Sequence, residues 1–244
     1  MTNLRQSKII TLFPAIAVLA IASLALPRHA AAQVTWTGTS GGDWNTGANW
    51  STGSKPTASG TALFNTTLTS VANAVADQTV TSISFDTNAG TANGTFTLGT
   101  TGGNKLILNS SFATQVGTSI LSTLTGTGKT ISVNASLSLA SSTYIFANNS
   151  ADSTNTLNFG GAISASASPT VTLSLAGVNT GTNTVSGAIT NGSATTFNVT
   201  KTGVGTWFSL RRQHLQWQHH HQRWDTPVER RGGRIPLLVE HPQV

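Results

Sequence analysis

The 244-residue chain contains no cysteine, and only 8% of its residues are charged. Without cysteine no disulfide framework supports the fold, so stability must come from backbone pairing and a continuous apolar core. Residues 33–207 contain no histidine and no glutamate, and four lysines there balance four aspartates. Catalysis needs positioned titratable groups, so this scarcity predicts that the chain is not an enzyme and binds no cofactor or metal ion.

The net charge of +6 comes from the two ends of the chain. Six arginines follow Trp207, interleaved with Trp217 and Trp224, and they imitate a nucleic-acid-binding patch. His219, His220 and His221 lie among them but lack the spacing that converges imidazoles on one metal ion. We predict no nucleic-acid partner and no dedicated metal site.

Residues 1–32 have the pattern of a secretory signal peptide. A basic start is followed by an apolar run from Ile9 to Leu26 and by three alanines, with the cleavage site expected between Ala32 and Gln33. A membrane anchor is the alternative, because the run approaches spanning length, but Pro14 interrupts it. We therefore expect export to the bacterial cell surface or the medium, with no membrane span in the mature chain.

Short runs with an apolar residue at every second position recur between Thr79 and Thr200. Period-two alternation is typical of strands with one buried face, and turns built from glycine and asparagine separate the runs. The fold class is therefore all-β. Local repetition and small outward side chains favour a right-handed parallel β-helix, or solenoid, with seven or eight coils of roughly 20 to 25 residues. A β-sandwich is the alternative.

The segment VTWTGTSGGDWNTGANWSTGSKPTASGTALF, residues 34–64, resembles the N-terminal segment of autotransporter-associated β-strand repeat proteins. The matching positions are Trp36, Asp43-Trp44-Asn45, Ala48-Asn49-Trp50, Pro56 and Thr61–Phe64. VTKTGVGTW, ending at Trp207, is similar to the segment that leads into the family's repeat. The resemblance implies a β-helical passenger region of an exported bacterial protein. It also implies a translocator barrel, which we expect to be absent from this chain.

The family's pattern stops at Trp207 but continues in another reading frame. Codons for Ser209 to Arg230 can be chosen so that, read one nucleotide later, they spell SLSGANTYSGNTTINGGTLQLS. Tryptophan has a single codon, TGG, so the shifted codons that begin inside those of Trp217 and Trp224 must encode glycine. The repeat has glycine at both of these positions. We therefore predict a frameshift near Phe208.

These observations divide the chain into four parts. We expect a signal peptide at 1–32, an N-terminal cap at 33–78, a repeat solenoid at 79–207 and a disordered tail at 208–244. In the cap, Trp36, Trp44 and Trp50 could stack on sugar rings, or they could shield the first coil from water.

The predicted function is a structural or adhesin-like passenger segment, with glycans or proteins of a host surface or matrix as partners. Two alternatives stay open. An extracellular carbohydrate-binding module would use the tryptophans, and a β-helical polysaccharide-active enzyme would need to gather aspartates such as Asp77 and Asp86.

Overall fold

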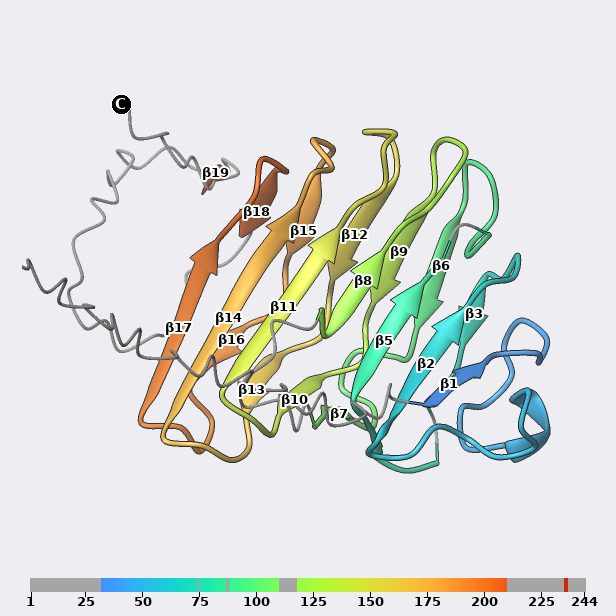
Figure 1. The fold of residues 1–244 in the computed structure, drawn as a ribbon, viewed down its shortest axis with the longest axis horizontal. Helices are drawn as coiled ribbons and strands as arrows, with labels where there is room; N and C mark the ends of the chain where they lie inside the picture. Colours follow the sequence, from blue (N-terminus) through green and yellow to red (C-terminus); the bar gives the residue numbers. More distant parts are fainter. Residues whose placement is uncertain (1–31, 74, 87, 110–117, 210–234, 237–244) are drawn as a thin grey trace, which may run out of the picture. The chain divides into compact units, whose positions relative to one another are not determined.

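The computed structural model describes residues 32–73, 75–86, 88–109, 118–209 and 235–236, which form a β-solenoid of about six turns (Figure 1). Along each turn the chain passes through three parallel sheets, called here sheets 1, 2 and 3 in the order in which the chain meets them. Sheet 1 contains β1 (Ala32–Thr35), β2 (Gly60–Phe64), β5 (Ser82–Phe85), β8 (Ile120–Ser122), β11 (Thr143–Asn148), β14 (Thr170–Gly177) and β17 (Thr196–Lys201).

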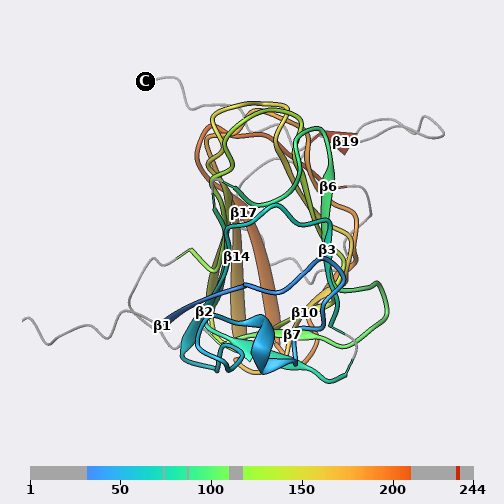
Figure 2. The same cartoon turned by 90° about the vertical axis from the view of Figure 1, so that its right-hand side faces the viewer.

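Sheets 2 and 3 complete each turn. Sheet 2 contains β3 (Ser70–Val71), β6 (Thr95–Leu98), β9 (Thr130–Val133), β12 (Thr156–Phe159), β15 (Asn183–Val185), β18 (Trp207–Ser209) and β19 (Ile235–Pro236). Sheet 3 contains β4 (Gln78–Val80), β7 (Leu106–Leu108), β10 (Leu137–Leu139), β13 (Ile163–Ala165) and β16 (Ile189–Thr190). Figure 2 looks along the stack from the β1 end, where the strands of the three sheets surround the core.

The predicted solenoid is confirmed, and the sandwich alternative is wrong. Each strand pairs in parallel with the strand one turn away, and among the described strands only β18 and β19 pair antiparallel. A sandwich instead pairs antiparallel strands within each sheet.

The coils are longer and fewer than predicted. Thr130 lies beside Thr156 and Thr170 beside Thr196, so the usual offset is 26 residues. Ile83 pairs with Ile120, an offset of 120 − 83 = 37 residues, because the turn between β7 and β8 is longer. The period-two pattern of the strands does not indicate how long the turns between them are. The prediction therefore made each coil too short and the number of coils too high.

The solenoid also starts earlier than predicted. β2 and β3 lie in sheets 1 and 2, within the region assigned to the cap, whereas the prediction placed the first repeat strand at residue 79. At the other end, Phe208 and Ser209 belong to β18, and Ile235 and Pro236 form β19, although the tail was predicted to begin at 208. The other residues of the predicted tail, and residues 1–31, lie outside the described ranges.

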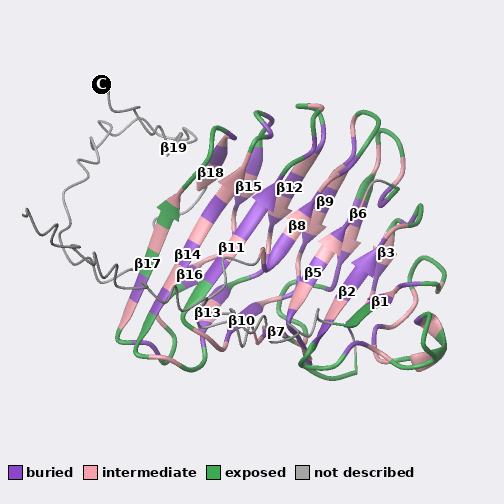
Figure 3. Cartoon of the chain, viewed as in Figure 1, coloured by how far each residue is buried: buried purple, intermediate pink, exposed green. Residues whose placement is uncertain are grey.

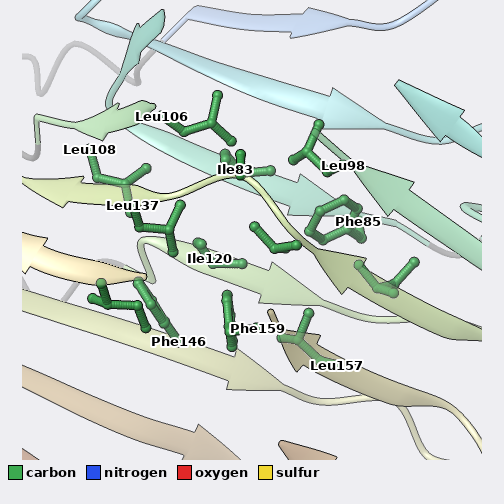
Figure 4. Packing of buried hydrophobic residues seen from close by; sticks show 14 of the residues in the cluster. Ile83, Phe85, Leu98, Leu106, Leu108, Ile120, Leu137, Phe146, Leu157 and Phe159 are labelled. Atoms are coloured by element: carbon green, nitrogen blue, oxygen red, sulfur yellow. The ribbon is translucent and has the colours of Figure 1, made fainter. Parts of the chain in front are cut away.

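Alternation along each strand builds the core. In β12, Leu157 and Phe159 are buried while Thr156 and Asn158 are half-buried, and Figure 3 shows similar banding along the other strands. Because the coils stay in register, inward side chains form columns. One column of sheet 1 runs through Ala62, Ile83, Ile120, Phe146 and Leu175. The columns from the three sheets meet in one hydrophobic cluster, part of which is shown in Figure 4.

Candidate interaction surface and the tryptophan cap

The three cap tryptophans are buried at the N-terminal end of the core. Trp36, Trp44 and Trp50 are 0%, 0% and 2% exposed. The ring centroids of Trp36 and Trp50 are 5.0 Å apart and those of Trp44 and Trp50 are 4.9 Å apart, both edge to face. All three rings contact Phe64, whose ring stacks on Phe85 at 5.5 Å. The cap is therefore continuous with the core of the coils.

This packing corrects the idea that the three rings form a sugar-binding platform. A flat platform needs exposed ring faces, whereas these rings face one another and Phe64. Burial of large aromatic surfaces at the first coil is what a capping role requires, because the end of a solenoid otherwise presents apolar side chains and strand edges to water.

The backbone before Trp44 forms an incomplete first coil. Gly41 N donates to Ser70 O at 2.9 Å, and Trp44 N donates to Ala72 O at 2.8 Å, so this segment runs beside β3. Asp43 Oδ1 accepts from Asn45 N at 2.7 Å and turns the chain, after which the 3₁₀ turn η1 (Gly47–Asn49) leads to Trp50. The segment thus adds a strand-like layer before it folds across the end of the core.

Lys55 connects the loop of the cap to β4 through hydrogen bonds that the sequence did not predict. Its Nζ donates to Asn45 Oδ1 at 2.5 Å and to Gln78 Oε1 at 2.7 Å. The two acceptors lie ten and 23 residues away along the chain. No local pattern links such positions, so only the folded arrangement could identify this contact.

The four aspartates accept hydrogen bonds from four different parts of the chain. Asp77 Oδ1 accepts from Lys105 N at 2.7 Å, and Asp86 Oδ1 accepts from Thr123 Oγ1 at 3.2 Å. Hydrogen bonds from the side chain and backbone of Thr154 lower the pKa of Asp152. Asp77 precedes β4 of sheet 3 and Asp86 follows β5 of sheet 1. Among the described residues, no three or more histidine, cysteine, aspartate or glutamate side chains gather as a metal ion would require.

A hydrogen-bonded group of asparagines inside the core was also missed. Asn148 Nδ2 donates to Asn183 Oδ1 at 2.7 Å, and Asn183 Oδ1 also accepts from Leu157 N at 2.9 Å. Asn179 Nδ2 donates to Ser150 O at 2.9 Å. Asn148, Asn179 and Asn183 are at most 2% exposed. Their amides satisfy backbone groups where the chain turns from sheet 1 to sheet 2, so their role is structural.

The outer face of sheet 2 presents two columns of uncharged polar side chains. One column contains Thr95, Thr130 and Thr156, and the other contains Thr97, Ser132, Asn158 and Thr184. We call these seven residues the hydroxyl face. Thr130 and Thr156 hydroxyls lie 3.2 Å apart, and Thr184 Oγ1 donates to Asn158 Oδ1 at 2.9 Å. The face offers donors, acceptors and methyl groups at the spacing of the strands, with no charge.

Two other groups of positions were considered in the sequence: the expected cleavage site at Ala32 and Gln33, and the histidines and arginines after Trp207. The structure describes only the first of them. Ala32 and Gln33 are exposed and begin β1, where they pair with Gly60 and Thr61. The histidine and arginine group, from Arg211 to Arg234, lies outside the described residues. In the part of the chain that is described, no helix has the length and hydropathy needed to cross a membrane.

No protein-family profile, curated protein or solved structure matches this chain.

Proposed function

We propose that the chain is an exported, non-catalytic segment of an autotransporter-type passenger, with a structural or adhesive role. The observation that carries this proposal is the hydroxyl face. One of its in-register, uncharged columns extends over β6, β9 and β12, and the other extends over the same three strands and β15. The resemblance of residues 34–64 to the family's N-terminal segment supports the same function. The partners proposed are neutral, hydrogen-bonding surfaces of glycans or proteins.

Adhesion through the hydroxyl face is tested by adding charge to it. Thr97→Lys combined with Ser132→Lys places two ammonium groups side by side on β6 and β9, where the two residues are in register. Neither side chain is hydrogen-bonded to another described residue, so the change removes no such bond. The matched control is Ser164→Lys with Thr190→Lys, an in-register pair on sheet 3.

Retention of the purified protein on immobilised neutral glycans and on matrix proteins is the measurement. We expect loss of retention in the sheet 2 variant alone, because two desolvated charges oppose contact with a neutral surface. Equal retention of both variants and the unaltered chain would contradict adhesion through this face.

Export is tested separately by expressing the full chain in a Gram-negative host. We expect the protein in the periplasm, the outer surface or the medium, and we expect a matched chain lacking residues 1–32 to stay in the cytoplasm. Cytoplasmic retention of the full chain would overturn the exported role.

The proposed frameshift near Phe208 rests on the sequence. It is tested by reading the nucleotide sequence beyond codon 208 one base later. A continuation of the glycine- and threonine-rich repeat is expected, whereas early stop codons in that frame would refute it.

A further inference from the structure

Gln33 becomes the first residue of the chain if the leader is removed after Ala32. That step belongs to the export proposed above, and the inference rests on it. In the structure Gln33 lies in β1 and is exposed. Its side-chain carboxamide makes no hydrogen bond with any described residue. Cleavage would therefore place an α-amine and an unengaged carboxamide on the same exposed residue.

The backbone nitrogen of Gln33 points away from the neighbouring strand. Trp36 N donates to Leu63 O at 2.8 Å, whereas Thr35 N donates to Ser51 Oγ at 3.1 Å, on the opposite side of the strand. Amides of successive residues in a strand alternate in direction. Gln33 is two residues before Thr35, so its nitrogen faces the edge of β1 opposite β2. A reaction at this nitrogen breaks no hydrogen bond between β1 and β2.

We propose that the mature N-terminus of this protein is pyroglutamate, formed by cyclisation of Gln33. The unprotonated α-amine attacks the side-chain carbon Cδ and forms the N–Cδ bond. The Cδ–Nε2 bond then breaks, the amine's proton passes to the leaving nitrogen, and ammonia departs. The product is a five-membered lactam, and the step needs no oxidant, reductant or second substrate.

The lactam changes the chemistry of the first strand without changing its pairing. An α-amine is ordinarily protonated over much of the neutral range, so cyclisation removes a positive charge from the edge of β1. It also removes the free amine that aminopeptidases bind. The contacts that hold β1, including Trp36 N to Leu63 O, remain available. The exposed start of the solenoid would thereby resist trimming that otherwise begins at β1.

The first experiment measures cyclisation directly on residues 33–244. The chain is produced with a removable N-terminal tag whose cleavage leaves Gln33 first, and it is incubated both folded and in denaturant. Intact mass and N-terminal peptide mass report the loss of one ammonia molecule. We expect the folded and unfolded chains to cyclise at comparable rates. A folded chain that keeps its amine while the unfolded chain loses it would overturn the inference.

Gln33→Ser is the matched control, because serine occupies the same exposed position and has no carboxamide to react. It should keep its mass and remain reactive toward an amine-specific label. If the control lost ammonia to the same extent, the reaction would belong to another residue and the inference would fail.

The second experiment determines the N-terminus of the protein exported with its own leader. A blocked N-terminal peptide beginning with cyclised Gln33 is expected. A free amine on Gln33, or a different first residue, would overturn the inference and leave the export proposal standing. Retention of residues 1–32 on protein held in the cytoplasm would overturn both.

Discussion

Two of the buried tryptophans of the cap, Trp44 and Trp50, differ in the hydrogen bonding of their indole nitrogens. Trp50 Nε1 donates to Trp44 O at 2.8 Å, whereas Trp44 Nε1 is buried and has no hydrogen-bond partner among the described residues. Their rings are in edge contact and both lie against Phe64. The two residues therefore provide a matched pair in which burial is nearly equal and hydrogen bonding is not.

Replacing each of these tryptophans by phenylalanine separates packing from hydrogen bonding. Both changes remove the same atoms from the core, so the packing losses should be similar. Trp50→Phe also leaves the carbonyl of Trp44 without its donor, and we expect it to cost about 1 kcal/mol more than Trp44→Phe. Chemical denaturation of both variants measures this difference. Equal losses would show that the Trp50 hydrogen bond contributes nothing.

Tyr144, the single tyrosine, gives the fold a defined sensitivity to alkali. Its hydroxyl donates to Leu108 O at 2.8 Å and accepts from Ser141 N. Burial raises the pKa of Tyr144 to about 12 from 10.0, although the hydrogen bonds with backbone groups act in the opposite direction. The folded state therefore holds this proton more tightly than the unfolded state.

The linkage sign follows from that difference. Between pH 10 and about 12 the unfolded chain binds fewer protons at this tyrosine, so the free energy of unfolding falls as pH rises. Below pH 10 Tyr144 contributes no pH dependence. Unfolding titrations at a series of alkaline pH values should show a weaker decline in Tyr144→Phe, because the hydroxyl whose pKa burial raises is then absent. An unchanged decline would mean that Tyr144 does not contribute to it.

At the scale of the strands and turns, neighbouring coils approach each other closely at the corner between sheets 2 and 3. A Cβ on Gly187 would collide with the carbonyl oxygen of Gly161, which lies 26 residues earlier in the preceding coil. A Cβ on Gly161 would in turn collide with the carbonyl of Ala135. Two successive turns therefore use glycine because backbone from the adjacent coil occupies the side-chain position.

Gly187→Ala should destabilise the fold by about 1–3 kcal/mol, the usual cost of forcing extra atoms into packed structure. Because the opposing atoms belong to backbone, one coil must move for the methyl group to fit. Thermal or denaturant unfolding measures the loss, and Thr190→Ala is the control, since Thr190 is exposed in the next strand. A Gly187→Ala variant as stable as this control would disprove the close approach.

The sequence predicted the strands at this scale because alternation is local. Leu157 and Phe159, two residues apart, already indicate a strand with one buried face, and the structure confirms it. Asn183 shows what alternation does not reveal. It occupies an inward position beside Leu157 and Trp207, and its hydrogen-bond partners lie up to 35 residues away. Its role depends on the register between coils, which requires the turn lengths.

For the candidate surface, the sequence likewise predicted the local pattern but not the arrangement between coils. Threonine at outward positions indicated an uncharged face, but the columns of Thr130 with Thr156 and of Ser132 with Asn158 arise from the 26-residue offset. The tryptophan cap was ambiguous in sequence because exposed platforms and buried caps use the same residues. Packing of Trp36, Trp44 and Trp50 on Phe64 distinguishes them.

For the whole molecule, the two ends of the solenoid differ in how they are covered. The N-terminal coil has the tryptophan cap, whereas β17 pairs with β14 alone among the described strands of sheet 1. In register, Leu175 of the inward column is followed by Lys201 in β17. Burial lowers the pKa of Lys201, and its Nζ donates to Thr202 O and Gly203 O at 2.8 and 2.7 Å. At this position of the inward column the last coil therefore has a lysine where the coils before it have apolar side chains.

Repeat proteins gain stability from each coil and from its interfaces with neighbours, so a terminal coil with one interface opens at lower cost than a central coil with two. Native-state hydrogen exchange should show faster exchange for β17 amides paired with β14 than for β14 amides paired with β11. At the N-terminal end, the difference in exchange rate between the terminal coil and its inner neighbour should be smaller, because opening β2 exposes the aromatic cluster around Phe64. Trp50→Ala should increase that difference at the N-terminal end and leave the exchange rates of the β17 amides unchanged. Uniform protection from β2 to β17 would mean that the solenoid opens only as a single cooperative unit, and the cap would then stabilise every coil equally.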